Sequence, residues 1–261
     1  MLTVFPVPAF ADNYLWIIHD AKHAVAIDPG DATPVIDYLT LHGLNLSAIL
    51  ITHHHGDHVG GIRGLLDWCG EPVPVYGPPN ENIPHLSQIA VSDTIVSIRA
   101  LELEFDVIEV PGHTAGHVAY YAKKNDWLFC GDTLFAGGCG RLFEGSAAQM
   151  QSSLAKLRAL PSETAFFCAH EYTLANLRFA LAVEPNNTAL KQRVVIETEK
   201  RSRGVPTLPS TIGLERATNP FFRWDAPDVI VAAGNASSGK ISAVASPASI
   251  FGAIREWKNN F

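Results

Sequence analysis

The sequence predicts an α/β protein in which a region of short buried strands is followed by a smaller helical region. Three observations lead to this class. Apolar runs rich in β-branched and aromatic residues recur from residue 2 to residue 169, separated by turn-forming residues. Several of these runs end directly at a histidine or an aspartate. After Thr173 the apolar residues recur at helical spacing instead.

The elements of the first region are expected as follows. Strands are expected at residues 2–7, 14–18, 24–27, 48–51, 73–76, 94–98, 103–110, 118–121, 127–130 and 165–169, the first three of them antiparallel. Helices are expected at 34–41, 59–68 and 147–160. Gly60 and Gly61 fall in the first turn of the second helix, where glycine lets the helix start pack close to the preceding loop.

The second region is expected to be mostly helical. Helices are expected at 174–183, 189–201 and 246–257, with a proline-containing connector at 204–228 and a flexible surface loop at 234–239. We place a domain boundary near residue 173. Residues 1–173 are expected to form a catalytic domain and residues 174–261 a helical, substrate-binding domain.

Composition excludes several classes of protein. The formal net charge of −7 argues against a nucleic-acid-binding surface. No apolar run is long enough to span a membrane, and the first ten residues do not look like a signal peptide. The four cysteines are scattered and include no CxxC pair, which favours free thiols in a reducing compartment. A cytoplasmic protein is therefore expected, with no membrane or nucleic-acid partner.

The densest chemical signal is the stretch from Thr52 to His58, which reads THHHGDH and follows the apolar run 48–51. Histidine is the commonest metal ligand in proteins, and carboxylate is a further donor. Alternate residues of an extended chain point to one side, so His53, His55 and Asp57 are expected to share a face. An expression-tag remnant would lie at a terminus and lack the intervening Gly56 and Asp57. A metal site is the better interpretation.

Strand ends elsewhere add further candidate ligands. Four times an expected buried strand ends at metal-capable residues, and rigid strand ends can hold a site accurately. The resulting set of seven candidate ligands is His53, His55, Asp57, His58, His113, Asp132 and His170. One carboxylate could bridge two ions about 3.5–4 Å apart, and such a pair makes water nucleophilic at neutral pH. The chemistry indicated is hydrolysis, with zinc as the best-fitting metal and iron or manganese also compatible.

These motifs resemble a known family. HxHxDH after a strand, then PGHTAGH, GDTLF and a later strand-ending histidine, resemble the metallo-β-lactamase superfamily. Within it, GDTLFAGGCGR (131–141), CAHEYT (168–173), NPFFR (219–223) and AIREWK (253–258) resemble the glyoxalase II (hydroxyacylglutathione hydrolase) family. The resemblance covers essentially the whole chain and implies an αββα sandwich followed by a C-terminal α-helical domain.

The resemblance also implies a reaction and roles for single residues. It implies hydrolysis of S-D-lactoylglutathione to D-lactate and glutathione, the second step of methylglyoxal detoxification, by a hydroxide that bridges two divalent ions. One ion would take His53, His55 and His113. The other would take Asp57, His58 and His170. Asp132 would bridge them, and Asp57 and Asp132 are the expected catalytic carboxylates. Glutathione would be held by Arg141, Tyr172, Arg255 and Lys258.

The sequence departs from the family pattern at two positions. Position 141 is Arg where better-known members have Lys, and position 143 is Phe where many have Tyr, so a hydroxyl contact to glutathione is absent. The charge at position 141 is kept, because arginine and lysine are both cationic.

Other functions of the same fold stay open at this point. They are a glutathione-persulfide dioxygenase with a single iron, another thioester hydrolase, a β-lactamase and a nuclease. A non-catalytic metal protein is a further alternative, although structural zinc sites are closed and usually rich in cysteine. The expected partner is a small glutathione thioester, and the chain is expected to be a monomer.

Simpler interpretations stand beside the functional ones. His54 is expected to point away from the ions. His117 is expected to be a satisfied buried polar group, and a partner that supports a metal ligand is the alternative. Asp28 is most simply a turn residue, and an orienting role toward a ligand histidine is the alternative. Cys139 is expected to have a packing role, because no base lies near it in sequence. Arg255 and Lys258 could form no more than a solvated helix end.

Overall fold

The structure is a computed structural model that describes residues 1–239 and 245–261. By its internal contacts the chain divides into two compact units. Unit 1 comprises Met1–Glu109 and Ala115–Gly131, and unit 2 comprises Val110–Thr114 and Asp132–Phe261. This division does not follow the boundary expected near residue 173, which stays a prediction.

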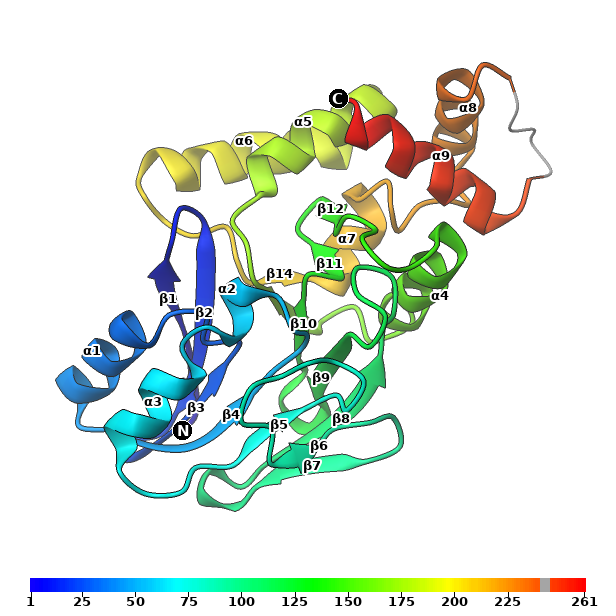
Figure 1. The fold of residues 1–261 in the computed structure, drawn as a ribbon. Helices are drawn as coiled ribbons and strands as arrows, with labels where there is room; N and C mark the ends of the chain where they lie inside the picture. The colour runs from blue at the N-terminus through cyan, green and yellow to red at the C-terminus, as the bar shows by residue number, and fades with distance from the viewer. Residues whose placement is uncertain (240–244) are drawn as a thin grey trace. The chain divides into compact units, whose positions relative to one another are not determined.

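The first sheet of unit 1 combines an antiparallel meander with parallel crossovers (Figure 1). Its strands are β1 (Thr3–Ala9), β2 (Asn13–His19), β3 (His23–Ile27), β4 (Asn45–Leu50), β5 (Val75–Gly77) and β6 (Gln88–Ile89), paired in that order. The first three strands are antiparallel, as expected, and the later pairs are parallel. Helix α1 (Ala32–His42) connects β3 to β4, and α2 (Gly56–Val59) and α3 (Ile62–Cys69) lie between β4 and β5.

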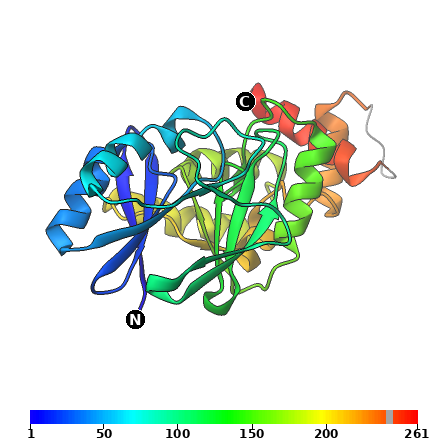
Figure 2. The same ribbon diagram turned by 60° about the horizontal axis from the view of Figure 1, so that its bottom comes forward.

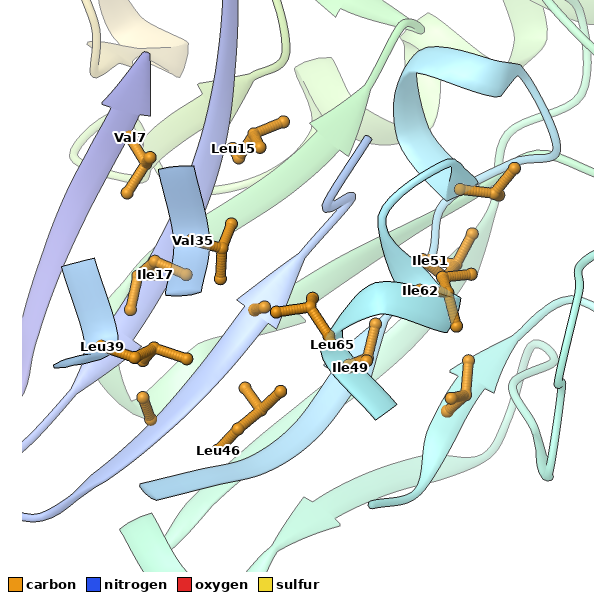
Figure 3. Packing of buried hydrophobic residues seen from close by; sticks show 14 of the residues in the cluster. Val7, Leu15, Ile17, Val35, Leu39, Leu46, Ile49, Ile51, Ile62 and Leu65 are labelled. Atoms are coloured by element: carbon orange, nitrogen blue, oxygen red, sulfur yellow. The ribbon is translucent and has the colours of Figure 1, made fainter. Parts of the chain in front are cut away.

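Helices α1 and α3 cover one face of this sheet with a dry hydrophobic core (Figure 3). Val35 and Leu39 of α1 and Leu65 of α3 are fully buried against Ile17 and Ile49 of the strands. Strand side chains alternate between the two faces, so their neighbours in sequence point the other way. The neighbours of Ile17 and Ile49 are buried as well, so the sheet is covered on both faces at β2 and β4.

A second, antiparallel sheet forms the next layer of unit 1 (Figure 2). Its strands in this unit are β7 (Ile95–Ile98), β8 (Leu103–Glu109), β9 (Val118–Ala122) and β10 (Trp127–Gly131), with one-turn 3-10 helices at Arg99–Leu101 and Lys123–Asn125. The buried Tyr120 hydroxyl donates to the Ile51 carbonyl at 2.7 Å. That bond ties the second sheet to the end of β4, where the histidine-rich stretch begins.

Unit 2 is mostly helical. Its elements are β11 (Leu134–Phe135), β12 (Gly138–Cys139), α4 (Ala147–Arg158), β13 (Ala165–Cys168), α5 (Thr173–Val183), α6 (Thr188–Ser202), β14 (Ser210–Thr211), α7 (Ile212–Thr218), α8 (Pro227–Ala236) and α9 (Pro247–Asn259). Side-chain caps begin several helices. Ser146 forms a capping box with Gln149 at α4, and Asn187 and Ser246 cap α6 and α9. Among the described residues, no helix is long and apolar enough to cross a membrane.

Three sequence expectations about the elements are corrected. The helix expected at 59–68 is interrupted at Gly60-Gly61 and becomes α2 and α3. The connector expected at 204–228 contains α7, whose start is capped by Thr211, and the start of α8 at Pro227. Proline is well tolerated in the first helical turn, so here it marks a helix start rather than a loop. The loop expected at 234–239 begins inside α8, and residues 240–244 lie outside the described residues.

The glycines at the start of α3 permit a close backbone approach, as expected, although the closest loop is the one before α1. A Cβ on Gly61 would lie 2.4 Å from the Pro29 carbonyl oxygen, and one on Gly60 would lie 2.6 Å from that of Gly30. A Cβ on Gly56 would have no heavy atom within 4 Å. The start of α3 therefore depends on the missing side chains at positions 60 and 61.

We expect Gly61→Ala to lower the free energy of unfolding by about 1–3 kcal/mol or more, because the methyl group overlaps backbone atoms that cannot move aside. Gly56→Ala, four to five residues away in the same connection, is the matched control and should stay within about 0.5 kcal/mol of the parent. Urea denaturation followed by circular dichroism measures both. Equal losses from the two variants would contradict the close-approach argument.

Candidate active site

The histidine-rich stretch of unit 1 begins at the end of β4 and enters α2. His53 and His58 are fully buried, and His55 and Asp57 are half-buried. His53 Nε2 and His55 Nδ1 lie 3.1 Å apart, and His58 Nε2 lies 3.6 Å from Asp57 Oδ2. Unit 1 thus brings its four predicted ligands together in two close pairs.

Asp28 orients this stretch, which is the alternative to a simple turn residue that the sequence left open. It stands at the end of β3 with a left-handed backbone (φ 51°) and is 3 % exposed. Its Oδ1 accepts from Thr52 N at 2.7 Å, and its Oδ2 accepts from Thr52 Oγ1 at 2.7 Å. The same Oδ2 lies 3.1 Å from His58 Nδ1. A carboxylate on one nitrogen of a histidine fixes the ring and presents the other nitrogen to a metal ion.

Three further contacts in unit 1 hold the stretch in place. Asn13 Nδ2 donates to Asp57 Oδ2 at 3.0 Å. The buried Glu81 carboxylate accepts from the backbone N–H of His54 at 2.9 Å, contacts the His54 ring, and accepts from Gly116 N at 2.7 Å. His54 therefore points to Glu81, consistent with its expected structural role. Asn13 and Glu81 carried no sequence signal, because each is an isolated residue far from the stretch it contacts.

His117 is fully buried and stacks on His53, with ring centroids 4.6 Å apart and planes inclined by 18°. It holds the His53 ring from one side, which agrees with its expected place as a buried group.

Unit 2 brings its three predicted ligands to one carboxylate oxygen. His113 Nε2 and His170 Nε2 each lie 3.4 Å from Asp132 Oδ2, and all three residues are nearly buried. His113 Nδ1 lies 2.9 Å from the Arg141 carbonyl oxygen, and the His170 ring stacks on Tyr172 at 4.6 Å with an interplanar angle of 2°. Both imidazoles therefore turn Nε2 toward the same oxygen.

These separations fit a metal-binding role for the donors in each unit. Two donors that share a tetrahedral ion at about 2.0–2.1 Å stand about 3.4 Å apart. The donor pairs in both units lie 3.1–3.6 Å apart. Imidazole nitrogen with carboxylate oxygen suits zinc, iron or manganese. Burial raises the pKa of the Cys139 and Cys168 thiols, which keeps them neutral and unsuited as ligands.

A pocket of about 470 Å³ in unit 2 opens beside these ligands. It is lined by all four residues that the family resemblance assigned to glutathione, Arg141, Tyr172, Arg255 and Lys258. His113 and Asp132 line the same pocket, as do Phe135, Cys139, Phe143, Ala175 and Asn176. Unit 2 therefore places three cations and a tyrosine in one cavity with two of the predicted metal ligands.

Arg255 is not a solvated helix end, which corrects the simpler interpretation. It is 4 % exposed, its guanidinium lies 5.1 Å from the centroid of the Phe221 ring, and Nη1 donates to the Cys139 carbonyl at 3.0 Å. Its buried Nε has no hydrogen-bond partner within the described part of the chain. A buried donor without a partner carries an energetic cost that an anionic ligand would relieve. The Cys139 thiol lies 3.7 Å from Arg255, in agreement with a packing role.

Lys258 is half-buried near the C-terminus of α9, and its Nζ donates to the Ala175 carbonyl at 3.3 Å. Burial, reinforced by the positive charges of Arg255, Arg178 and Arg141, lowers the pKa of Lys258 to about 8. The ammonium also lies 4.9 Å from the centroid of the Phe179 ring. The pocket thus holds a cation whose charge changes just above neutral pH.

Two family models together match almost the whole chain. Residues 9–170 match the metallo-beta-lactamase superfamily, and residues 171–261 match the hydroxyacylglutathione hydrolase C-terminus. A hydroxyacylglutathione hydrolase of Nitrosomonas eutropha is 51% identical over 261 residues and is covered completely by the alignment, as is this chain. One of Nitrosomonas europaea is 51% identical over 262 residues, with 100% of this chain and 97% of the relative covered.

Solved structures agree in fold, which confirms the expected metallo-β-lactamase architecture. The BLEG-1 B3 metallo-beta-lactamase is 25% identical with a TM-score of 0.62 over 85% of this chain and 99% of its own. TTHA1623 in a di-iron-bound form is 27% identical with a TM-score of 0.60, over 84% and 100%. ETHE1 from Myxococcus xanthus is 28% identical with a TM-score of 0.57, over 66% and 76%.

Asp28→Asn should lower the affinity for divalent metal ions about 10–100-fold, because an amide holds the His58 ring less firmly than a carboxylate does. Competition against a chromophoric chelator measures that affinity without reference to activity. Asp31→Asn is the control, since Asp31 caps α1 and contacts none of the candidate ligands among the described residues. Unchanged metal affinity in Asp28→Asn would remove the orienting role.

Proposed function

The chain belongs to the hydroxyacylglutathione hydrolase family of the metallo-β-lactamase superfamily, and on this premise we propose that it hydrolyses S-D-lactoylglutathione to D-lactate and glutathione. The observation that carries the proposal is the unit 2 pocket, where three cations lie in one cavity with His113 and Asp132. Glutathione has two carboxylates, which arginine binds through paired hydrogen bonds and lysine as a point charge. This reaction is the second step of methylglyoxal detoxification.

We propose that the seven ligands hold two divalent metal ions in the arrangement of the family. His53, His55 and His113 would hold one, Asp57, His58 and His170 the other, and Asp132 would bridge them. The equal distances from Asp132 Oδ2 to two imidazole nitrogens support the bridging role. Zinc fits this donor set best, and iron and manganese fit as well. When bound, the ions supply Lewis acidity that makes water a nucleophile at neutral pH.

The chain's own residues position the substrate and the water. Arg255 offers its unpartnered Nε, and Arg141 and Lys258 add charge at the same pocket. Tyr172 is fixed by stacking on His170, so it presents a rigid edge to the substrate. The carboxylates of Asp57 and Asp132 accept hydrogen bonds from the attacking water and hold it near the thioester carbon. Hydrolysis forms a bond between the water oxygen and the thioester carbon and breaks the carbon–sulfur bond, and the glutathione sulfur leaves and takes up the proton that the water releases.

The cationic side chains of the unit 2 pocket form no ion pair with a carboxylate of the described residues. Within the described residues, no carboxylate lies within 4.0 Å of the charged ends of Arg141, Arg255 or Lys258. In a chain with 26 acidic and 19 basic residues, this local excess of positive charge attracts an anionic substrate. The same charge pattern favours a glutathione thioester over a neutral one.

The persulfide dioxygenase is the second candidate. It would need neither two metal ions nor the cations of α9, whereas α9 lies within the stretch that matches the hydrolase C-terminal model. Oxygen uptake with glutathione persulfide would identify it. We further propose that the chain acts in the cytoplasm as a monomer, in keeping with its four free cysteines.

The first test is the loss of thioester absorbance of S-D-lactoylglutathione, run together with metal analysis of the same sample. Turnover with about two metal ions per chain supports both the substrate and the site. A sample that holds two metal ions but does not turn over keeps the hydrolytic site and overturns the substrate. Other acyl thioesters would then be assayed.

Asp132→Ala should reduce kcat at least about 100-fold and lower the metal content, because it removes the one oxygen that faces both His113 and His170. Asp225→Ala is the control, since Asp225 pairs with Arg158 at the surface and should leave kcat unchanged. Full metal content and normal turnover in Asp132→Ala would exclude the bridging role.

The KM for the glutathione thioester should rise between pH 7 and pH 9, because the pKa of Lys258 is about 8 and its positive charge is lost over that range. Lys258→Arg keeps its charge throughout and should show a smaller rise. The KM of the parent is divided by the KM of Lys258→Arg at pH 7, 8 and 9. Titration of the substrate affects both proteins equally and cancels in this ratio. Parallel curves for the two proteins would show that Lys258 does not bind a carboxylate.

A further inference from the structure

The short hairpin β11–β12 of unit 2 connects Asp132, a candidate metal ligand, with Arg141, a candidate glutathione-binding residue. It follows Asp132 by two residues and precedes Arg141 by two, and it pairs only Leu134 with Cys139 and Phe135 with Gly138. Residues 134–140 are all buried. A hairpin with two residue pairs is not stable by itself, so its remaining backbone groups need other partners.

Two buried asparagines supply donors to the hairpin carbonyls. Asn219 Nδ2 donates to the Phe135 carbonyl at 3.3 Å and to the Gly138 carbonyl at 2.9 Å. Asn176 Nδ2 donates to the Ala136 carbonyl at 3.2 Å. Asn219 is completely buried, and Asn176 is 5 % exposed. Both amides are therefore committed to the hairpin rather than to solvent.

A buried carboxylate completes the set. Glu215 Oε2 accepts from Gly137 N at 2.8 Å and from Asn219 Nδ2 at 3.0 Å. Its Oε1 accepts from Arg193 Nη2 at 2.6 Å, so the buried charge is paired. We call Asn176, Asn219 and Glu215 the hairpin clamp. It comes from α5, α7 and the residue after α7.

The clamped hairpin also forms the wall of the substrate pocket. Phe135 and Cys139 line that pocket, and the Cys139 carbonyl accepts from Arg255. At the other end of the hairpin, Gly140 passes so close to Asp132 that a Cβ would lie 1.9 Å from the Asp132 carbonyl oxygen. Any shift of the hairpin would therefore move the cation end of the pocket relative to Asp132.

We propose that the hairpin clamp is a positioning device that sets the spacing between Asp132 and the cations that bind glutathione. The inference rests on the proposed function and extends it to residues outside the candidate metal ligands and the cations that bind glutathione, of which Asn176 also lines the pocket. A clamp of this kind acts on substrates anchored at both ends. A small thioester without the glutathione carboxylates is held at one end only, so the rate of its hydrolysis should not depend on the spacing between Asp132 and the cations.

The test compares two lactoyl thioesters, those of glutathione and of N-acetylcysteamine, in the wild type and in Asn219→Ala. The kcat/KM for the glutathione thioester should fall about 10–100-fold, because a displacement of about 1 Å can cost that much in rate. The value for the N-acetylcysteamine thioester should change less than about 2-fold. Metal content should stay at the wild-type level, because the clamp contacts no candidate ligand.

Asn187→Ala is the matched control. Asn187 Nδ2 donates to the Ala217 carbonyl at 2.9 Å, the same kind of bond in the same unit but away from the hairpin. It should leave the ratio of the two kcat/KM values unchanged. If Asn219→Ala does not fold, Asn219→Ser, whose hydroxyl can still accept from Phe221 N but which lacks the amide donor, should show the same selective loss.

Three outcomes would overturn the proposal: an unchanged ratio in both clamp variants, equal losses for the two thioesters at full metal content, or the same selective loss in Asn187→Ala. Failure of the proposed function is distinguishable, because it appears in the wild type as an absence of glutathione thioester turnover. In that case the clamp is tested by measuring the affinity for S-methylglutathione by calorimetry. Weaker binding in Asn219→Ala alone supports it, and equal binding in wild type and variant overturns it.

Discussion

The buried carboxylate of Asp28 is the interaction on which the first half of the site depends. A buried imidazole is costly unless its polar atoms are satisfied, and it binds metal usefully only when its ring is fixed. The Asp28 carboxylate lies 3.1 Å from Nδ1 of His58 and so orients that ring, while it also accepts two hydrogen bonds from Thr52. It does so from a left-handed backbone position at the end of β3, next to the end of β4. The strand ends and the ligand stretch are thereby tied to one charged group.

In unit 2 a buried carboxylate again lies against imidazole rings, and a group of cationic side chains lies beside it. One oxygen of Asp132 faces two imidazoles, and the second nitrogen of His113 lies against a backbone carbonyl. Within the described part of the chain the cations of the neighbouring pocket have no carboxylate partners, and burial lowers the pKa of Lys258. Holding such charges apart from the chain's many acidic groups costs folding free energy. A cost of this kind is expected at a binding site, where an anionic ligand offsets it.

The sequence identifies residues that belong to a recurring pattern, such as the ligands at strand ends. It does not identify residues whose role depends on a single contact with a distant segment. The ligands stand out because each follows a buried strand. Asn13 and Glu81 give no such signal, since their importance lies in contacts with residues 44 and 27 positions away. The proline-containing segment 204–228 was misjudged for a related reason. Pro227 and the Thr211 cap begin helices that tertiary packing stabilises.

The sequence by itself determined the α/β class, the strands that end in metal-capable residues, and, through its motifs, the family. Those features are local, because periodicity and short motifs are written in consecutive residues. The tertiary structure decided which side chains orient the ligands, that Arg255 is buried rather than solvated, and that Asn219 of the NPFFR segment serves a hairpin 81–84 residues earlier. Hydrogen bonds between distant segments follow no sequence period, so only the folded chain reveals them.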